Sequence, residues 1–258
     1  GYQALHLTSQ GQFNTAVGAF SLDANTTANY NVAMGMNSMG ANTTGCCNVG
    51  IGTDALRTQT TAICNTAIGH QAGYSTTTGK LNTAIGRGAG CAVNIGQCNT
   101  SLGVEALRNL SEGSNNIGIG YQSGTDSAVR QINGTCSNNI VLGNTNHTNA
   151  YIKIDWTVTS DLRDKTNIED VPHGLDFVNQ ITPIKYNFKK SREDATSHGK
   201  ARFGFKAQEI LALEGEDPII INNDNVDNLS LTSAYLLPVL VNAIKELKTQ
   251  NDNLITRI

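Results

Sequence analysis

A pattern of polar and apolar positions repeats every 17 residues along the first half of the chain. Each repeat holds an asparagine, a small residue two positions later, an apolar residue three positions later and a glycine four positions later. A second small residue follows three positions after the glycine. The repeat asparagines are Asn14, Asn31, Asn48, Asn65, Asn82, Asn99 and Asn116, and their glycines are Gly18, Gly35, Gly52, Gly69, Gly86, Gly103 and Gly120.

The repeat predicts a β-solenoid in which each 17-residue unit forms one coil. Helical hairpin repeats need roughly 33 residues or more, and a high content of Asn, Gly and Thr disfavours helix. Glycine or asparagine can adopt the left-handed conformations that the corners of a coil require. Coils about 4.8 Å apart give a rod of roughly 35 Å. We therefore expect a mainly β shaft over residues 1–126, and oligomerisation is a natural source of extra burial for so narrow a coil.

The period fails after Gly124, and we expect connecting strands over residues 127–159. Residues 139–143 look like one displaced coil. Further on, apolar side chains alternate with polar ones, which is the period of a half-buried strand. These apolar residues are Ile152, Ile154, Trp156 and Val158.

Apolar residues near the end of the chain alternate spacings of three and four, which predicts a long helix with a coiled-coil seam. Asn251 is a polar register residue in this seam, and Pro238 falls in the first turn of the helix or kinks it. The alternative is a helix that packs on its own domain, and both arrangements can hold in different parts of it. The seam residues are Leu237, Leu240, Ile244, Leu247, Asn251, Leu254 and Ile258.

Charge divides the chain near residue 150. Residues 1–150 hold 5 basic residues (Lys and Arg) and 5 acidic residues (Asp and Glu), whereas residues 151–258 hold 13 basic and 16 acidic residues. Neither part carries the basic stripe of a nucleic-acid-binding surface, so we expect no nucleic-acid partner. No apolar run approaches the roughly 20 residues of a membrane span, so we expect no membrane insertion.

Three of the six cysteines directly precede a repeat asparagine: Cys47, Cys64 and Cys98. Other repeats hold Phe13 or Tyr30 at that position, so we interpret it as an inward apolar column of reduced core cysteines. Disulfides and zinc are disfavoured because no Cys-x-x-Cys pair exists. The five histidines also lack metal-ligand spacing, and we expect neither a metal nor a cofactor.

The Asn-Thr-Ala-Ile-Gly motifs at residues 65–69 and 82–86 resemble the β-roll heads of trimeric autotransporter adhesins. The likeness covers about residues 1–125, although the repeat is longer here. It implies a trimeric, surface-exposed adhesive rod.

A second resemblance begins at Ser160-Asp161-Leu162-Arg163-Asp164-Lys165. This hexapeptide is similar to the Ser-Asp-x-Arg-x-Lys signature that opens the intramolecular chaperone domains of endosialidase tailspikes and phage tail fibres. Residues 182–188 resemble the Pro-x-x-Tyr strand of that family, residues 203–210 its Gly-x-x-Ala-Gln-Glu segment and residues 235–247 its terminal helix. The likeness implies an α+β chaperone domain over residues 160–258.

The resemblance implies that this domain drives trimerisation and folding of the fibre and then cuts itself off with a serine–lysine dyad. The matching residues are Ser160 as nucleophile and Lys165 as general base, with Asp161 and Arg163 supporting the cleavage motif. A lysine removes the proton of a serine only if burial or nearby positive charge lowers its pKa. Arg163 could supply that charge, whereas Asp161 and Asp164 would oppose it.

The spacing of the dyad adds a constraint. Five residues apart, Ser160 and Lys165 would point to opposite faces of a strand or lie about 140° apart on a helix. The dyad therefore requires a turn after Ser160, at the end of the strand through Trp156. The alternative is an ordinary polar turn with a solvated Lys165. The side of Ser160 on which cleavage falls stays open.

The preferred function is a homotrimeric virion tail fibre or surface spike that is assembled in the host cytoplasm and binds a glycan or protein receptor on the host cell. Its peptidase activity would be a single self-cleavage, without an external substrate. One alternative is a non-cleaving trimerisation domain on a cell-surface adhesin. Another is the tail of a larger glycan-degrading spike, although the shaft carboxylates are not paired in sequence. A membrane-tethered transcription factor with the same chaperone would need a basic region.

Overall fold

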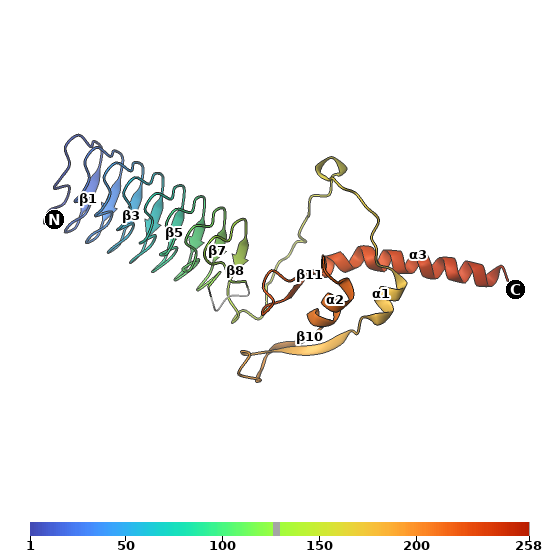
Figure 1. Ribbon diagram of the computed structural model, residues 1–258. Helices are drawn as coiled ribbons and strands as arrows, with labels where there is room; N and C mark the ends of the chain where they lie inside the picture. Colours follow the sequence, from blue (N-terminus) through green and yellow to red (C-terminus); the bar gives the residue numbers. More distant parts are fainter. Residues whose placement is uncertain (126–129, 258) are drawn as a thin grey trace. The chain divides into compact units, whose positions relative to one another are not determined.

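The computed structural model describes residues 1–125 and 130–257 and divides into two compact units, residues 1–149 and 150–258 (Figure 1). The first unit confirms the predicted β-solenoid with its 17-residue coils. One short strand per coil pairs in parallel with the strand of the next coil, in sequential order from β1 to β8. The strands are β1 Thr15–Val17, β2 Val32–Met34, β3 Val49–Ile51, β4 Thr66–Ile68, β5 Thr83–Ile85, β6 Thr100–Leu102, β7 Ile117–Ile119 and β8 Ile140–Leu142.

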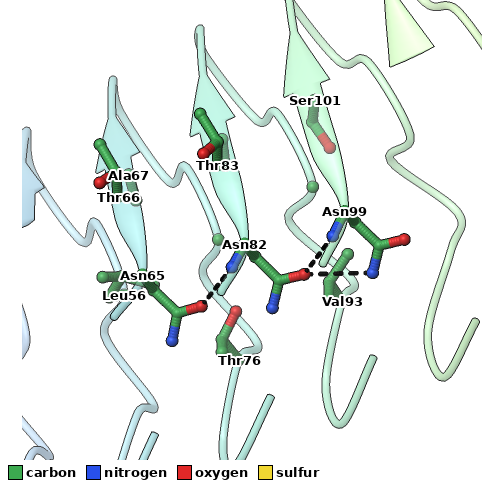
Figure 2. A pocket seen from close by; sticks show the side chains of 13 residues that line it. Leu56, Asn65, Thr66, Ala67, Thr76, Asn82, Thr83, Val93, Asn99 and Ser101 are labelled. Atoms are coloured by element: carbon green, nitrogen blue, oxygen red, sulfur yellow. Dashed lines mark hydrogen bonds between the residues drawn. The ribbon is translucent and has the colours of Figure 1, made fainter. Parts of the chain in front are cut away.

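The repeat asparagines form a ladder of hydrogen bonds along the solenoid (Figure 2). The backbone N–H of Asn82 donates to Asn65 Oδ1 at 2.9 Å, and Asn82 Oδ1 in turn accepts from the backbone N–H of Asn99 at 2.9 Å. The Nδ2 group of Asn82 donates to the Gly96 carbonyl at 2.8 Å. Because these side chains are buried, each amide satisfies backbone groups that water does not reach.

The repeat glycines lie where the backbones of successive coils come closest. Gly69 has a φ of +136°, a conformation that L side chains rarely adopt. A Cβ atom at Gly69 would also lie only 2.6 Å from the Gly86 carbonyl oxygen. The glycine column is therefore required both by its backbone angle and by the spacing of the coils.

The left-handed corners of each coil differ from the expectation. They are held largely by residues other than the repeat asparagines, for example Leu56 (φ 49°), Cys64 (φ 58°) and Gln71 (φ 57°). The asparagines instead use their side chains to bridge coils. The backbone N–H of each of these three residues bonds to a carbonyl of a neighbouring coil. Such bonds help to hold side chains in a left-handed corner that would disfavour them in isolation.

The predicted inward cysteine column is wrong. Cys47, Cys64 and Cys98 are exposed, and Phe13 and Tyr30 in the same column are 69% and 59% exposed. This side chain lies two positions before the first strand residue, so it alternates outward with the first and third strand residues, whereas the repeat asparagine between them is buried. The interior is filled by the middle strand residue, the small residue after the glycine and the residue following it; its buried members include Leu22, Ala33, Met39, Ala55, Leu56, Ala67, Ala72, Ala84 and Ala89.

The displaced coil is confirmed. β8 continues the sheet in parallel with Gly118 opposite Val141, and Asn139 extends the ladder with two 3.1 Å bonds to Asn116 Oδ1. The sheet therefore extends beyond the boundary predicted at residue 126. That residue itself lies outside the described part of the chain.

The second unit has the mixed α and β composition that the resemblance implies. Its core gathers Phe177, Ile210, Ile220, Ile221, Leu236 and Val239. β9 and β10 pair antiparallel, as do β11 and β12. The elements are η1 Leu162–Asp164, α1 Leu175–Gln180, β9 Ile184–Lys189, β10 Ser197–Gly204, α2 Ala207–Glu214, β11 Ile221–Asn222, β12 Ser230–Leu231, η2 Ser233–Tyr235 and α3 Leu236–Ile255.

The strand predicted over residues 152–158 is wrong for the single chain. These residues form neither strand nor helix, and Trp156 and Val158 are 76% and 81% exposed. A strand needs a partner for its backbone N–H and C=O groups, and the alternating pattern alone does not supply one.

The terminal helix α3 has two apolar faces. Leu236, Val239 and Ala243 are buried, whereas Leu237 and Ile244 on the predicted seam are 62% and 66% exposed. Pro238 lies in the first turn, where its missing N–H has no helical partner to lose. The helix thus packs on its own unit through one face, and the coiled coil stays a prediction. Ile258 of the seam lies outside the described residues.

The glycine column predicts a large and specific effect of one methyl group. Gly69→Ala should destabilise the solenoid by about 3 kcal/mol or more, because strain and overlap with the Gly86 carbonyl add. Gly134→Ala is the control, since it also has positive φ (+52°) but nothing lies within 4 Å of its added Cβ. It should cost only about 1 kcal/mol. Chemical unfolding followed by circular dichroism compares the two, and equal losses would contradict the close approach of the coils.

Candidate functional site

The structure brings the two predicted catalytic side chains together. Lys165 Nζ lies 2.8 Å from Ser160 Oγ, with the lysine as donor in the hydrogen bond. The turn that the spacing required is the 3₁₀-helix η1, Leu162–Asp164, between the two residues. Both side chains are exposed in the single chain.

Asp161 starts the turn as its N-cap. Its Oδ1 atom accepts the backbone N–H of Arg163 at 2.9 Å, which satisfies one of the free amides at the start of the 3₁₀-helix. The backbone N–H of Lys165 then closes the turn on the Leu162 carbonyl at 3.2 Å. Asp161 therefore acts as a positioning residue that places Lys165 near Ser160.

Arg163 pairs with Asp161 and not with the lysine. Its guanidinium donates to both carboxylate oxygens, through Nε at 3.1 and 3.2 Å and through Nη2 at 2.6 Å. This arrangement holds the pKa of Asp161 below its usual value and the pKa of Arg163 above it. The sequence offered Arg163 as a charge that could act on Lys165, but the structure shows its charge balanced by the neighbouring aspartate.

The segment that follows the dyad is fixed to the terminal helix. Asn242 Nδ2 in α3 donates to the Val171 and His173 carbonyls at 3.0 and 3.3 Å, and Glu246 Oε2 accepts the backbone N–H of Leu175 at 2.7 Å. Both side chains lie in residues 235–247, the segment that resembles the terminal helix of the family, but sequence reasoning assigned them no role because a helical pattern does not say which loop a polar side chain contacts. The one local signal is Gly174, where a Cβ atom would overlap the Glu246 carboxylate.

Clusters of metal-ligating side chains and membrane-spanning helices are both absent from the described residues. No group of three or more His, Cys, Asp and Glu side chains there could hold a metal ion. In the same residues, no helix combines the length and apolar character needed to cross a membrane.

The fold and the turn define a β-solenoid shaft followed by an α+β unit that opens with a serine–lysine pair. Residues 160–216 match the family model described as "Chaperone of endosialidase" (Peptidase_S74). This match and the solenoid fit the C-terminal chaperone region of a phage tail fibre or spike protein. The family match covers three of the four segments that resemble the chaperone domains, and the terminal helix lies beyond residue 216. No curated protein and no solved structure matches the chain.

The ion pair in the turn has a measurable consequence. In a carboxyl NMR titration, Asp161 should titrate below the usual aspartate range, and Arg163→Gln should return its pKa toward that range. Because the folded-state pKa is lowered, the stabilisation of the turn is full above the usual aspartate pKa and is lost as the pH falls through the lowered value. Lys165→Gln serves as the control and should leave Asp161 unchanged. An unshifted Asp161 in the wild-type protein would contradict this geometry.

Proposed function

We propose that this chain is the C-terminal part of a homotrimeric virion fibre or spike that attaches to the host surface. Its terminal domain drives trimerisation and folding of the fibre and then releases itself by autoproteolysis next to Ser160. The observation that carries the proposal is the 2.8 Å contact between Ser160 and Lys165 at the first residues of the chaperone match.

The contact suits proton transfer from serine to lysine. A general base must lie within about 2.6–3.2 Å of the atom that loses the proton. As a neutral amine, Lys165 takes the Ser160 hydroxyl proton while Oγ attacks the carbonyl carbon of a flanking peptide bond. The C–N bond then breaks, the protonated lysine gives its proton to the leaving nitrogen, and water hydrolyses the resulting ester.

Assembly is expected to complete the site. A lysine reacts as a base only in its neutral form, and removal from water favours that form. Because Ser160 and Lys165 are exposed in the single chain, neighbouring subunits would supply the burial. The exposed seam of α3 and the apolar residues of segment 152–158 offer surfaces for those subunits. Cleavage would thus follow trimerisation and mark a correctly folded fibre.

Attachment to the host is proposed for the shaft. A stiff rod of stacked coils presents side chains at regular intervals, which suits repeated weak contacts with a glycan or protein receptor. The proposed setting is the virion surface after assembly in the host cytoplasm.

The dyad is tested with purified full-length chains in denaturing gels and by light scattering. The wild-type chain should form trimers and split near residue 160, and the masses of its two fragments locate the broken bond. Ser160→Ala and Lys165→Arg should form the same trimers and stay intact, because the first lacks the nucleophile and the second keeps the charge without a usable base.

Lys153→Arg and Ser191→Ala are the matched controls, at exposed residues outside the dyad, and both should cleave like the wild type. A wild-type trimer that remains whole would sink the autoproteolysis and leave a non-cleaving trimerisation domain. A monomeric wild type would contradict the proposed fibre as well.

A further inference from the structure

The outer surface of the eight-stranded sheet repeats in columns along the whole solenoid. We define the outer sheet face as the residue two positions before the first strand residue together with the first and third strand residues, because the repeat asparagine and the middle strand residue between them point inward. Its third-residue column is Val17, Met34, Ile51, Ile68, Ile85, Leu102, Ile119 and Leu142. Its first-residue column holds only Thr, Val and Ile. The column two positions before the first strand residue, called the pre-strand column, holds Phe13, Tyr30, Cys47, Cys64, Leu81, Cys98, Asn115 and Asn138.

This face is apolar but uncovered. Met34, Ile68 and Leu102 are 42%, 37% and 42% exposed, and Phe13 and Tyr30 stack on each other in the open with ring centroids 5.0 Å apart. With coils about 4.8 Å apart, the face runs for roughly 35 Å. Exposed apolar surfaces of more than a few hundred Å² mark interaction sites in soluble proteins.

Charge is excluded from the same face. Within the described coils, none of its positions holds Asp, Glu, Lys or Arg. Charged side chains of the solenoid lie on other columns, where Arg87, Arg108 and Gln122 surround the Glu105 carboxylate. Soluble protein surfaces normally intersperse charges, so an uncharged apolar face of this length favours association.

The regular spacing identifies what covers it. The side chains in each apolar column repeat once per coil. A partner can therefore contact all of them only if its own side chains repeat at the same interval. A parallel copy of this chain in the same register has that interval by construction. An unrelated receptor would meet the columns at only a few coils.

We propose that the outer sheet face is the surface through which copies of this chain pack side by side, parallel and in register. The inference deepens the proposed trimeric fibre and rests on it, since it locates the contact between the shafts. The pre-strand column then has a role in assembly: its Phe, Tyr, Leu and Cys side chains, which do not fill the solenoid interior, fill the space between chains.

Thiol labelling of the native oligomer tests this surface directly. The full-length chain with all six cysteines replaced by serine receives one new cysteine, either Ile68→Cys on the outer sheet face or Ile95→Cys on another face. The two isoleucines are comparably exposed in the single chain, at 37% and 45%. Each variant is labelled with a water-soluble maleimide at oligomer concentrations, and the rate is compared with that in denaturant.

Packed shafts should slow labelling of Ile68→Cys by about tenfold or more relative to Ile95→Cys, because the protected thiol reacts only after local opening. In the wild-type oligomer, Cys98 should be protected in the same way, a readout that needs no substitution. Equal labelling in a stable trimer would overturn the proposed surface and leave the trimeric fibre standing. A monomer would overturn both. Protection that appears only when host surface material is added would assign the face to a receptor and also overturn the proposal.

Discussion

The buried asparagine ladder is the interaction on which the shaft depends. Each side-chain oxygen accepts the N–H of the repeat asparagine in the next coil, and each interior Nδ2 group donates to a backbone carbonyl, as Asn82 does to Gly96. A coil of 17 residues is narrow and buries little apolar surface. An unpaired buried amide would cost about 1–3 kcal/mol, which so small a core could not easily offset. The ladder satisfies these groups at the same height in every coil. It thereby fixes the register of the coils.

That division of inside and outside has consequences for assembly. Because alanine, serine and glycine fill much of the interior, the larger apolar side chains of the strands remain on the outer surface. The same imbalance appears in the second unit, where α3 buries one apolar face and leaves the other, with Leu247 and Leu254, exposed. In both units, therefore, large apolar side chains remain exposed in the single chain. A serine–lysine pair that is likewise exposed belongs with this picture, since association would cover apolar surface and exclude water from the dyad.

Much of the fold could be predicted from the sequence because the strongest signal, a fixed period, is also the strongest structural constraint. The period placed Asn65, Gly69 and the displaced coil correctly. The inward direction predicted for the column of Cys64 came from the apolar residue types in it, whereas alternation with the buried Asn65 and Ala67 places Cys64 on the outside. The alternation around Trp156 predicted a strand, but a single chain offers no partner for it. The proximity of Ser160 to Lys165 followed from a required turn, whereas the pairing of Asp161 with Arg163 depends on side-chain rotamers that no pattern encodes.

The ladder is tested most directly by amide hydrogen exchange in Asn82→Ala, with Asn149→Ala, an exposed asparagine at the end of the same unit, as the control. The account predicts that the backbone N–H of Asn99, which loses its bond to Asn82 Oδ1, exchanges faster by a factor of ten or more, with the effect fading over the neighbouring coils. The control should leave that exchange unchanged. Unaltered protection at Asn99 in Asn82→Ala would show that strand pairing alone holds the coils and would contradict the central place given to the ladder.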